Sequence, residues 1–110
     1  MTTDQPVLID EPEIADRAIR AACTAFGVTR QLFMSGSRRA DLCNARRTAC
    51  NLMFESGITN HRTIAWYISR SHATVYHHIA THRNLYEYNL QYRKSYDSAK
   101  SIYMAAGAEL

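Results

Sequence analysis

The segment 64–79, with the sequence IAWYISRSHATVYHHI, narrows the choice of fold more than any other part of the chain. Ser71 is a strong N-cap residue, so one short helix is expected to end and another to begin within about three residues. Apolar residues lie at helical spacing on both sides of Ser71, namely Ile64, Ala65, Ile68, Val75 and Ile79. The pattern predicts a helix-turn-helix, with a first helix over 61–67 and a second over 71–82.

The second of these helices has an outer face of small, polar and basic side chains. With Val75 and Ile79 pointing inward, the residues that face outward are Arg70, His72, Ala73, Thr74 and His77. A helix-turn-helix places the first turn of its second helix against base edges in the DNA major groove. The alternative is an ordinary helical hairpin whose outer face is polar.

Further helix boundaries divide the rest of the chain. The residues that start or stop helices are Asp10, Gly27, Thr29, Gly57, and either Thr59 or Asn60. They predict a long helix, a short helical turn and a second long helix before the helix-turn-helix. No stretch alternates with a period of two for long enough to be a strand. We therefore expect an all-α fold, a compact helical bundle that contains the helix-turn-helix.

A long amphipathic helix is expected over 84–110. Its apolar stripe is formed by Leu85, Tyr88, Tyr92, Ala99, Ile102 and Ala106, flanked by Tyr96 and Tyr103. The stripe is expected either to cover the core or to bind a partner, because tyrosine is enriched at interfaces. The predicted organisation is thus a flexible tail over 1–9, a DNA-binding domain over 10–83 and a C-terminal helix over 84–110.

Length and composition exclude several classes of protein. The 110 residues correspond to one domain, and no apolar run approaches the roughly 20 residues that span a bilayer. The start of the chain, MTTDQP, resembles no signal peptide, so we expect a cytoplasmic protein without membrane attachment. The three cysteines, Cys23, Cys43 and Cys50, form no C-x-x-C pair and are expected to be reduced packing residues.

No catalytic or metal-binding constellation is evident. The acidic residues are scattered, and no serine or cysteine has an orienting base nearby, so we expect no enzyme activity. His78 and His82 lie four residues apart, but no third ligand has suitable spacing. We therefore predict no metal ion and no cofactor.

Positive charge is concentrated in the middle of the chain. Residues 38–83 contain seven arginines against Asp41 and Glu55, whereas 1–37 are net acidic and 84–110 are balanced. Arginine binds phosphate and guanine edges in a bidentate manner. Arg38, Arg39, Arg46 and Arg47 are expected on an outer face, where clustered cations contact phosphates.

Three patches, over about 14–83, resemble the C-terminal DNA-binding domain of the bacterial replication initiator DnaA. The first is AFGVT at 25–29 followed by Leu32-Phe33. The second is Ser37-Arg38-Arg39 followed by ARRTA at 45–49, and the third is RSHATV at 70–75, ending at His77. The spacing from Glu55 to His72 also fits without a gap.

The resemblance implies roles for individual residues. His72 and Thr74 match positions that contact bases in the major groove, and Arg70 matches a DNA contact. Asn44 stands where the family has an arginine that enters the minor groove. Ser71 replaces an aspartate that can accept a hydrogen bond from cytosine, and Ala73 replaces a serine or threonine, so a target other than the DnaA box is expected. The ATPase part of the initiator and its glycine-rich phosphate loop are missing, so ATP hydrolysis is not expected.

These observations predict a sequence-selective transcription regulator that binds double-stranded DNA at the nucleoid. An activator is favoured, with the C-terminal helix contacting RNA polymerase, another transcription factor or a second copy of the chain, and a phage-like origin fits the small size. The alternatives are a replication-origin-binding accessory protein and a protein–protein interaction module without DNA binding. The predicted DNA-binding residues are Arg38, Arg39, Asn44, Arg46, Arg47, Arg62, Arg70, Ser71, His72, Ala73, Thr74 and His77.

Overall fold

The computed structural model describes residues 10–108, so the predicted tail over 1–9 lies outside the described residues. Within this range the chain forms helices only, which confirms the all-α prediction. The helices are α1 (Glu11–Phe26), α2 (Arg30–Met34), α3 (Ala40–Glu55), α4 (His61–Ile68), α5 (His72–Tyr88) and α6 (Leu90–Ala108).

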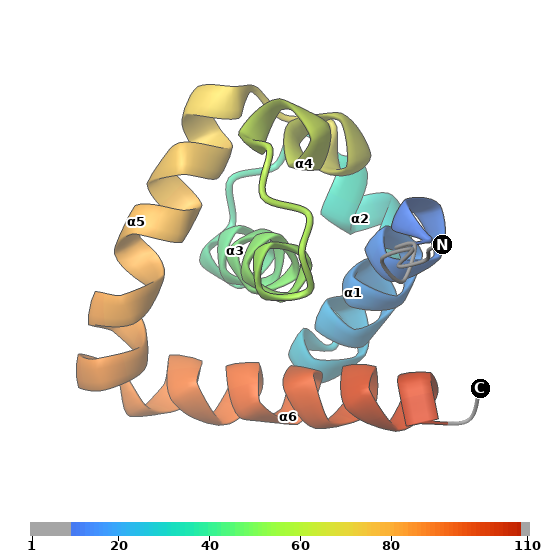
Figure 1. Cartoon of the computed structure of the whole chain (residues 1–110). Coiled ribbons are helices and arrows are strands. Elements are labelled where there is room, and N and C mark those ends of the chain that lie inside the picture. Colours follow the sequence, from blue (N-terminus) through green and yellow to red (C-terminus); the bar gives the residue numbers. More distant parts are fainter. Residues whose placement is uncertain (1–9, 109–110) are drawn as a thin grey trace.

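The helix α3 lies at the centre of the molecule, and α1, α4, α5 and α6 surround it (Figure 1). The predicted inward residues of α3 are all buried: Leu42, Ala45, Ala49, Leu52 and Met53. The helix α5 begins beside α4 and ends beside α6, so its first turn lies at the corner of the molecule away from α6 (Figure 1).

Several helices begin or end at the predicted residues. The Asp10 carboxylate accepts a hydrogen bond from the Glu13 amide (3.3 Å), and Thr29 caps α2 in the same way. Gly27 ends α1 with φ 67°, a left-handed conformation that favours glycine. Of the two candidate caps for α4, Asn60 is the one used, because its side chain accepts from the amide of Arg62 (2.9 Å).

The helices α4 and α5 form the predicted helix-turn-helix. Ile64, Ile68 and Val75 are fully buried, so the apolar faces of both helices meet the core. Ser69 turns the chain with φ 57°, and the Arg70 amide donates to the Ala65 carbonyl (3.0 Å), which closes the end of α4. These contacts fix the angle at which α5 leaves the turn.

The boundary between the last two helices differs from the prediction. The helix α5 continues to Tyr88 rather than ending near 82, since no glycine or proline interrupts it. The chain bends at Asn89, whose backbone is extended, and the Asn89 side chain accepts from the Tyr92 amide (3.0 Å) at the start of α6. The long C-terminal helix therefore starts at Leu90 and not at 84.

The tyrosines of α6 pack against the molecule's own core. Tyr92, Tyr96 and Tyr103 are buried, and the Tyr92 hydroxyl lies 2.8 Å from the His82 ring nitrogen Nδ1. Of the two roles expected for the stripe, covering the core is thus the one observed for these residues. Tyr88, predicted to belong to the inward stripe, is instead 76% exposed, because it lies on the last turn of α5, before the bend.

Candidate nucleic-acid interface

The outer side of the helix-turn-helix, together with the α2–α3 loop, forms the surface that the sequence singled out. We call it the helix-turn-helix surface and define it by its solvent-facing residues, which are Arg38, Arg62, Trp66, Arg70, Ser71, His72, Ala73, Thr74, Tyr76 and His77. All are exposed except Arg70 and Thr74, which are half-buried. The structure therefore brings together eight of the twelve predicted site residues.

The first turn of α5 is well ordered by its cap. The Ser71 hydroxyl accepts from the Thr74 amide (3.2 Å) and also lies 3.0 Å from the Thr74 hydroxyl. His72 and Ala73, between these two residues, leave their side chains exposed. The amides of a helix N-terminus carry partial positive charge, so this turn favours negative groups.

Two hollows flank the first turn of α5, and Arg70 lines both of them. The larger one, of about 530 Å³, lies between the α2–α3 loop and α5. It is lined by Gly36, Ser37, Arg38, Cys43, Arg46, Arg70, Thr74 and His78. The smaller one lies between α4 and α5, and is lined by Arg62, Ala65, Trp66, Arg70 and His72.

Arg70 connects the turn of the motif to the α2–α3 loop. One guanidinium nitrogen donates to the Ser69 carbonyl (2.8 Å), and another donates to the Ser35 carbonyl. Neither acceptor is a carboxylate, so these hydrogen bonds form no ion pair with the Arg70 guanidinium beside the first turn of α5. The DNA contact that the resemblance implied for Arg70 stays a prediction.

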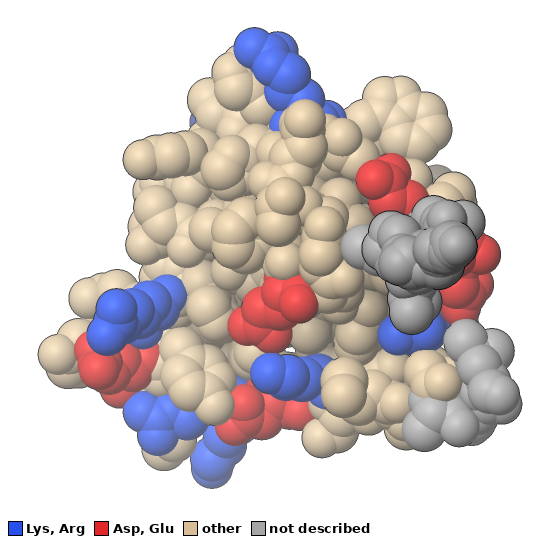
Figure 2. Space-filling view, in the orientation of Figure 1, with Lys and Arg blue, Asp and Glu red and all other residues tan. Residues whose placement is uncertain are grey.

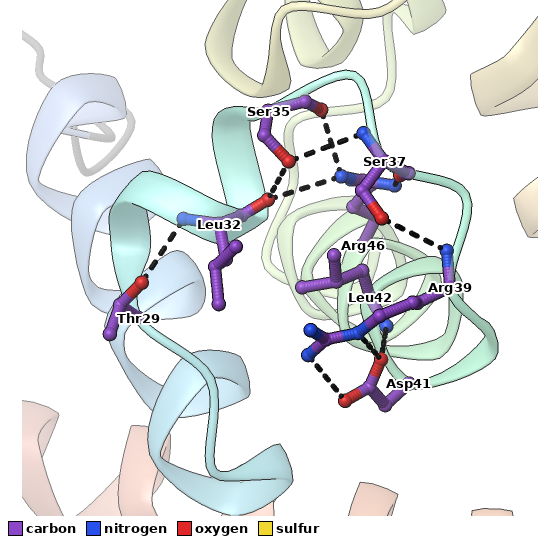
Figure 3. A network of polar contacts seen from close by, with 8 residues as sticks. All are labelled: Thr29, Leu32, Ser35, Ser37, Arg39, Asp41, Leu42 and Arg46. Carbon is purple, nitrogen blue, oxygen red and sulfur yellow. Dashed lines mark hydrogen bonds and ion pairs between the residues drawn. The ribbon is translucent and has the colours of Figure 1, made fainter.

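Arg46 is not on an outer face, as predicted, but is only 2% exposed. Figure 3 shows it beneath the α2–α3 loop, where its guanidinium donates to several carbonyl oxygens. The acceptors are Leu32 (3.3 Å), Phe33 (2.8 Å), Ser35 (2.9 Å) and Ser37 (2.8 Å). Burial, and then the charge of Arg70, lower the pKa of Arg46. Arg46 thus holds the loop in place and leaves no side-chain surface for a phosphate.

Arg47 and Asn44 are also placed differently from the prediction. Arg47 is 9% exposed and donates to the Thr81 hydroxyl (3.0 Å) and to the Asn44 side-chain carbonyl (2.6 Å). Asn44 lines a hollow with residues of α1 and α6, among them Phe26 and Tyr92, and not the helix-turn-helix surface. Both residues lie on faces of α3 that other helices cover, so neither is positioned to contact DNA bound at α5.

The two arginines that precede α3 differ in their pairing. Arg39 is exposed but forms an ion pair with Asp41 (3.0 Å), and its hydrogen bonds are the main reason that the pKa of Asp41 is lowered. Arg38 is exposed and has no ion pair among the described residues. Of the two, Arg38 is the residue with a free charge beside the larger hollow.

Trp66 is an exposed aromatic residue on α4. Aromatic residues on helices usually pack against the core, but Trp66 is 77% exposed. Its neighbour Tyr67 takes the half-buried position, with its hydroxyl 3.4 Å from the Glu11 carboxylate, to which it donates. The spacing of Ile64, Ala65 and Ile68 contains the signal, because Trp66 falls opposite that apolar face.

The histidines occupy three kinds of environment. His72 and His77 are exposed on α5, whereas His78 is buried and its Nδ1 has no partner among the described residues. Burial, followed by the charge of Arg47, lowers the pKa of His78 to about 4. His82 lies among Tyr86, Tyr92 and Tyr96. Within 10–108, no three histidines, cysteines or acidic residues are grouped so that they could hold a metal ion.

The charges are unevenly distributed over the elements. Between 56 and 86, which includes all of α4 and most of α5, the sequence has no acidic residue. In Figure 2, basic atoms lie at the top of the molecule, over α4, whereas basic and acidic atoms mix along the lower edge, near α6. The helix-turn-helix surface is therefore suited to an anionic partner.

Comparison with protein-family models, with curated proteins and with solved structures gave no match. None of the helices in the described part of the chain combines the length and apolar character needed to cross a bilayer.

Proposed function

We propose that the protein binds double-stranded DNA in a sequence-selective manner and regulates transcription, with α5 as its recognition helix. The observation that supports this most directly is the environment of the first turn of α5. His72 and Ala73 are exposed on this turn, and Arg38, Arg62 and Arg70 line the two hollows beside it. No acidic residue belongs to α4 or to this turn. A recognition helix needs this combination of protruding first turn and flanking cations.

In the proposed complex the first turn of α5 enters the major groove. His72 can donate or accept a hydrogen bond at a base edge, and the Ala73 methyl can contact a thymine methyl. Arg38 lines the hollow on one side of the turn, Arg62 lines the hollow on the other side, and Arg70 lines both, so the three can contact phosphates on both sides of the groove. These contacts would set the register of the helix on the duplex.

The burial of Arg46 and Arg47 changes the expected electrostatics of binding. With Arg38, Arg62 and Arg70 as the phosphate contacts, the slope of log K against log salt concentration should be about −3. If all the arginines of 38–47 contacted phosphates as well, the slope would be steeper than −5. The salt dependence of binding thus tests the placement of the arginines directly.

The resemblance to the DnaA C-terminal domain supports the same orientation of α5, and it is part of the proposal. So are nucleoid association, a phage-like origin and an activating role through RNA polymerase or a second copy of the chain. The α6 tyrosines Tyr92, Tyr96 and Tyr103 are buried, so a contact with RNA polymerase or a second copy would have to use other residues. Tyr88 and Leu90, at the corner between α5 and α6, are exposed and are candidates for this contact.

The test of the proposal is selection of bound sequences from a random duplex pool, followed by affinity measurements on the selected site. His72→Ala should weaken binding to the selected site by about 1–3 kcal/mol and leave binding to random duplex almost unchanged. Lys94→Ala, which removes an exposed charge from α6, is the matched control and should change neither affinity. If the pool yields no enriched sequence, or if His72→Ala weakens both affinities equally, α5 does not contact bases.

A second experiment separates regulation of transcription from the alternative role at a replication origin. Sites occupied in cells can be mapped by chromatin immunoprecipitation. Enrichment at promoters supports a regulator, whereas enrichment confined to an origin supports an accessory replication protein. A protein–protein module predicts no enrichment and no steep loss of affinity for duplex as salt rises.

A further inference from the structure

We propose that Trp66, on α4, contacts the sugar–phosphate backbone of bound duplex DNA beside the groove that α5 enters. This inference rests on the proposed function. It adds a second contact from α4, the first helix of the motif, from which Arg62 is the only predicted site residue.

The exposure of Trp66 has no explanation within the described fold. Tryptophan is highly buried on average in folded proteins, yet this one is 77% exposed. Among the aromatic rings of the described residues, the Trp66 ring pairs with that of the neighbouring Tyr67, in an edge-to-face arrangement with ring centroids 5.2 Å apart. Within 10–108 its indole N–H donates to no acceptor. A large apolar ring, and a donor without an acceptor among the described residues, are therefore both available to a partner.

The neighbours of Trp66 identify the class of partner. Arg62 lies one turn earlier on the same face of α4, and the hollow between α4 and α5 is lined by Trp66 together with Arg62, Arg70 and His72. On this side the ring shares a hollow with two guanidinium groups, next to the first turn of the proposed recognition helix. Trp66 also lines a second hollow, which contains Glu11 of α1. Charge complementarity therefore favours a polyanion on the side of the ring that faces α5.

The chemistry of indole fits the backbone of a duplex better than it fits the bases or a protein. Indole has one N–H donor and no acceptor, which matches phosphate oxygens, and its face can pack on deoxyribose. A second copy bound through this face by a twofold axis would place Arg62 and Arg70 of both copies close together. The acid that shares a hollow with Trp66 is Glu11 of α1, and its carboxylate already accepts from the Tyr67 hydroxyl. The duplex backbone is therefore the favoured occupant.

The experiment uses the fact that Trp66 is the only tryptophan in the chain, so its fluorescence reports on this position alone. The wild-type protein is titrated with a 30-base-pair duplex of random sequence at low salt, and its emission is recorded. Binding is measured independently by the anisotropy of a labelled duplex. We expect the emission to shift to the blue or to be quenched in parallel with the anisotropy change.

Variants then measure the contribution of the contact. Trp66→Ala should weaken binding about tenfold, to selected and random duplex alike, because a hydrogen bond to a charged phosphate and a packed ring are lost. Trp66→Phe keeps an aromatic face without the donor and should lose less. Met104→Ala removes another exposed apolar side chain (59%) from α6, and this variant should bind as the wild type does.

The outcomes distinguish this inference from the proposed function. If the duplex binds with the expected salt dependence but Trp66→Ala keeps wild-type affinity and the emission does not change, Trp66 is not a contact, while DNA binding stands. If no duplex binds, the proposed function fails and the inference fails with it. If the emission instead changes with protein concentration in the absence of DNA, a second copy occupies this face and the inference is wrong.

Discussion

Replacing Arg46 by alanine should lower the stability of the protein severely, although the sequence pattern alone placed this residue on the surface. The guanidinium donates four hydrogen bonds to the carbonyls of Leu32, Phe33, Ser35 and Ser37. Arg46 forms no ion pair with a carboxylate among the described residues. The hydrogen bonds to these carbonyls therefore offset the desolvation cost of its buried charge. Alanine would leave a cavity and remove one donor from each of these carbonyl oxygens, although the Ser35 carbonyl still accepts from Arg70 and the Leu32 carbonyl from the Ser35 amide and hydroxyl.

The expected loss can be estimated from these bonds. A hydrogen bond contributes about 1 kcal/mol net, and more when one partner is charged, so four bonds correspond to about 4 kcal/mol. Domains of this size are stable by only about 5–15 kcal/mol. The variant should therefore unfold at a temperature lower by about 15 °C or more. Arg46→Lys should recover only part of the loss, because an ammonium group cannot reach four carbonyls with the geometry of a guanidinium.

The assay is urea unfolding followed by the circular dichroism of the helices. Arg38→Ala is the matched control, since Arg38 is exposed and has no ion pair among the described residues, and its free energy of unfolding should change by less than about 0.5 kcal/mol. A loss below 1 kcal/mol for Arg46→Ala, or equal losses for the two variants, would refute the assignment of Arg46 as the residue that holds the α2–α3 loop.

Further predictions concern charge, pH and thiol reactivity. Arg62→Ala should reduce the salt slope of duplex binding by about one, whereas Lys94→Ala should leave the slope unchanged. Because the pKa of His78 is lowered to about 4 by burial, the unfolded state binds its proton first as the pH falls. The wild-type protein therefore has its full free energy of unfolding above pH 6.5 and loses about 3 kcal/mol of it at most as the pH falls towards 4. In His78→Gln, the free energy of unfolding measured in urea should vary less with pH over this range. Burial raises the pKa of the Cys50 thiol to about 12. Iodoacetamide should therefore modify half-buried Cys43 in the native protein and Cys50 only after unfolding, and mass spectrometry of the peptides would show this order.

The helices could be predicted from the sequence because their signals are local. Caps such as Asp10 and Ser71 act within three residues, and the apolar periodicity fixes which face is inward. The end of α5 was placed wrongly because the signal there is weak. No glycine or proline marks the bend, which lies at Asn89. Asn89 starts α6 through the hydrogen bond that its side chain accepts from the Tyr92 amide.

The candidate site was predicted in part, and the errors have a common physical origin. A helical pattern indicates which face of α3 is apolar, but not whether another helix covers the opposite face. Arg46 and Arg47 are long enough to reach carbonyl and hydroxyl groups of other elements, and this tertiary pairing decides their burial. Trp66 is the converse case, since its apolar character suggested packing, while its position on α4 left it outside.

Arg47 and Asn51 lie behind the proposed interface and hold α5 in position. Arg47 donates to the Thr81 hydroxyl (3.0 Å), and the Asn51 side chain donates to the His78 carbonyl (3.3 Å), so both tie α3 to the middle of α5. Arg47→Met should therefore weaken duplex binding by misplacing the recognition helix, not by removing a phosphate contact. The affinity for the selected site should fall while the salt slope stays the same as in the wild type. A slope reduced by about one, as expected for Arg62→Ala, would instead mean that Arg47 reaches a phosphate in the complex and that α3 moves when DNA binds.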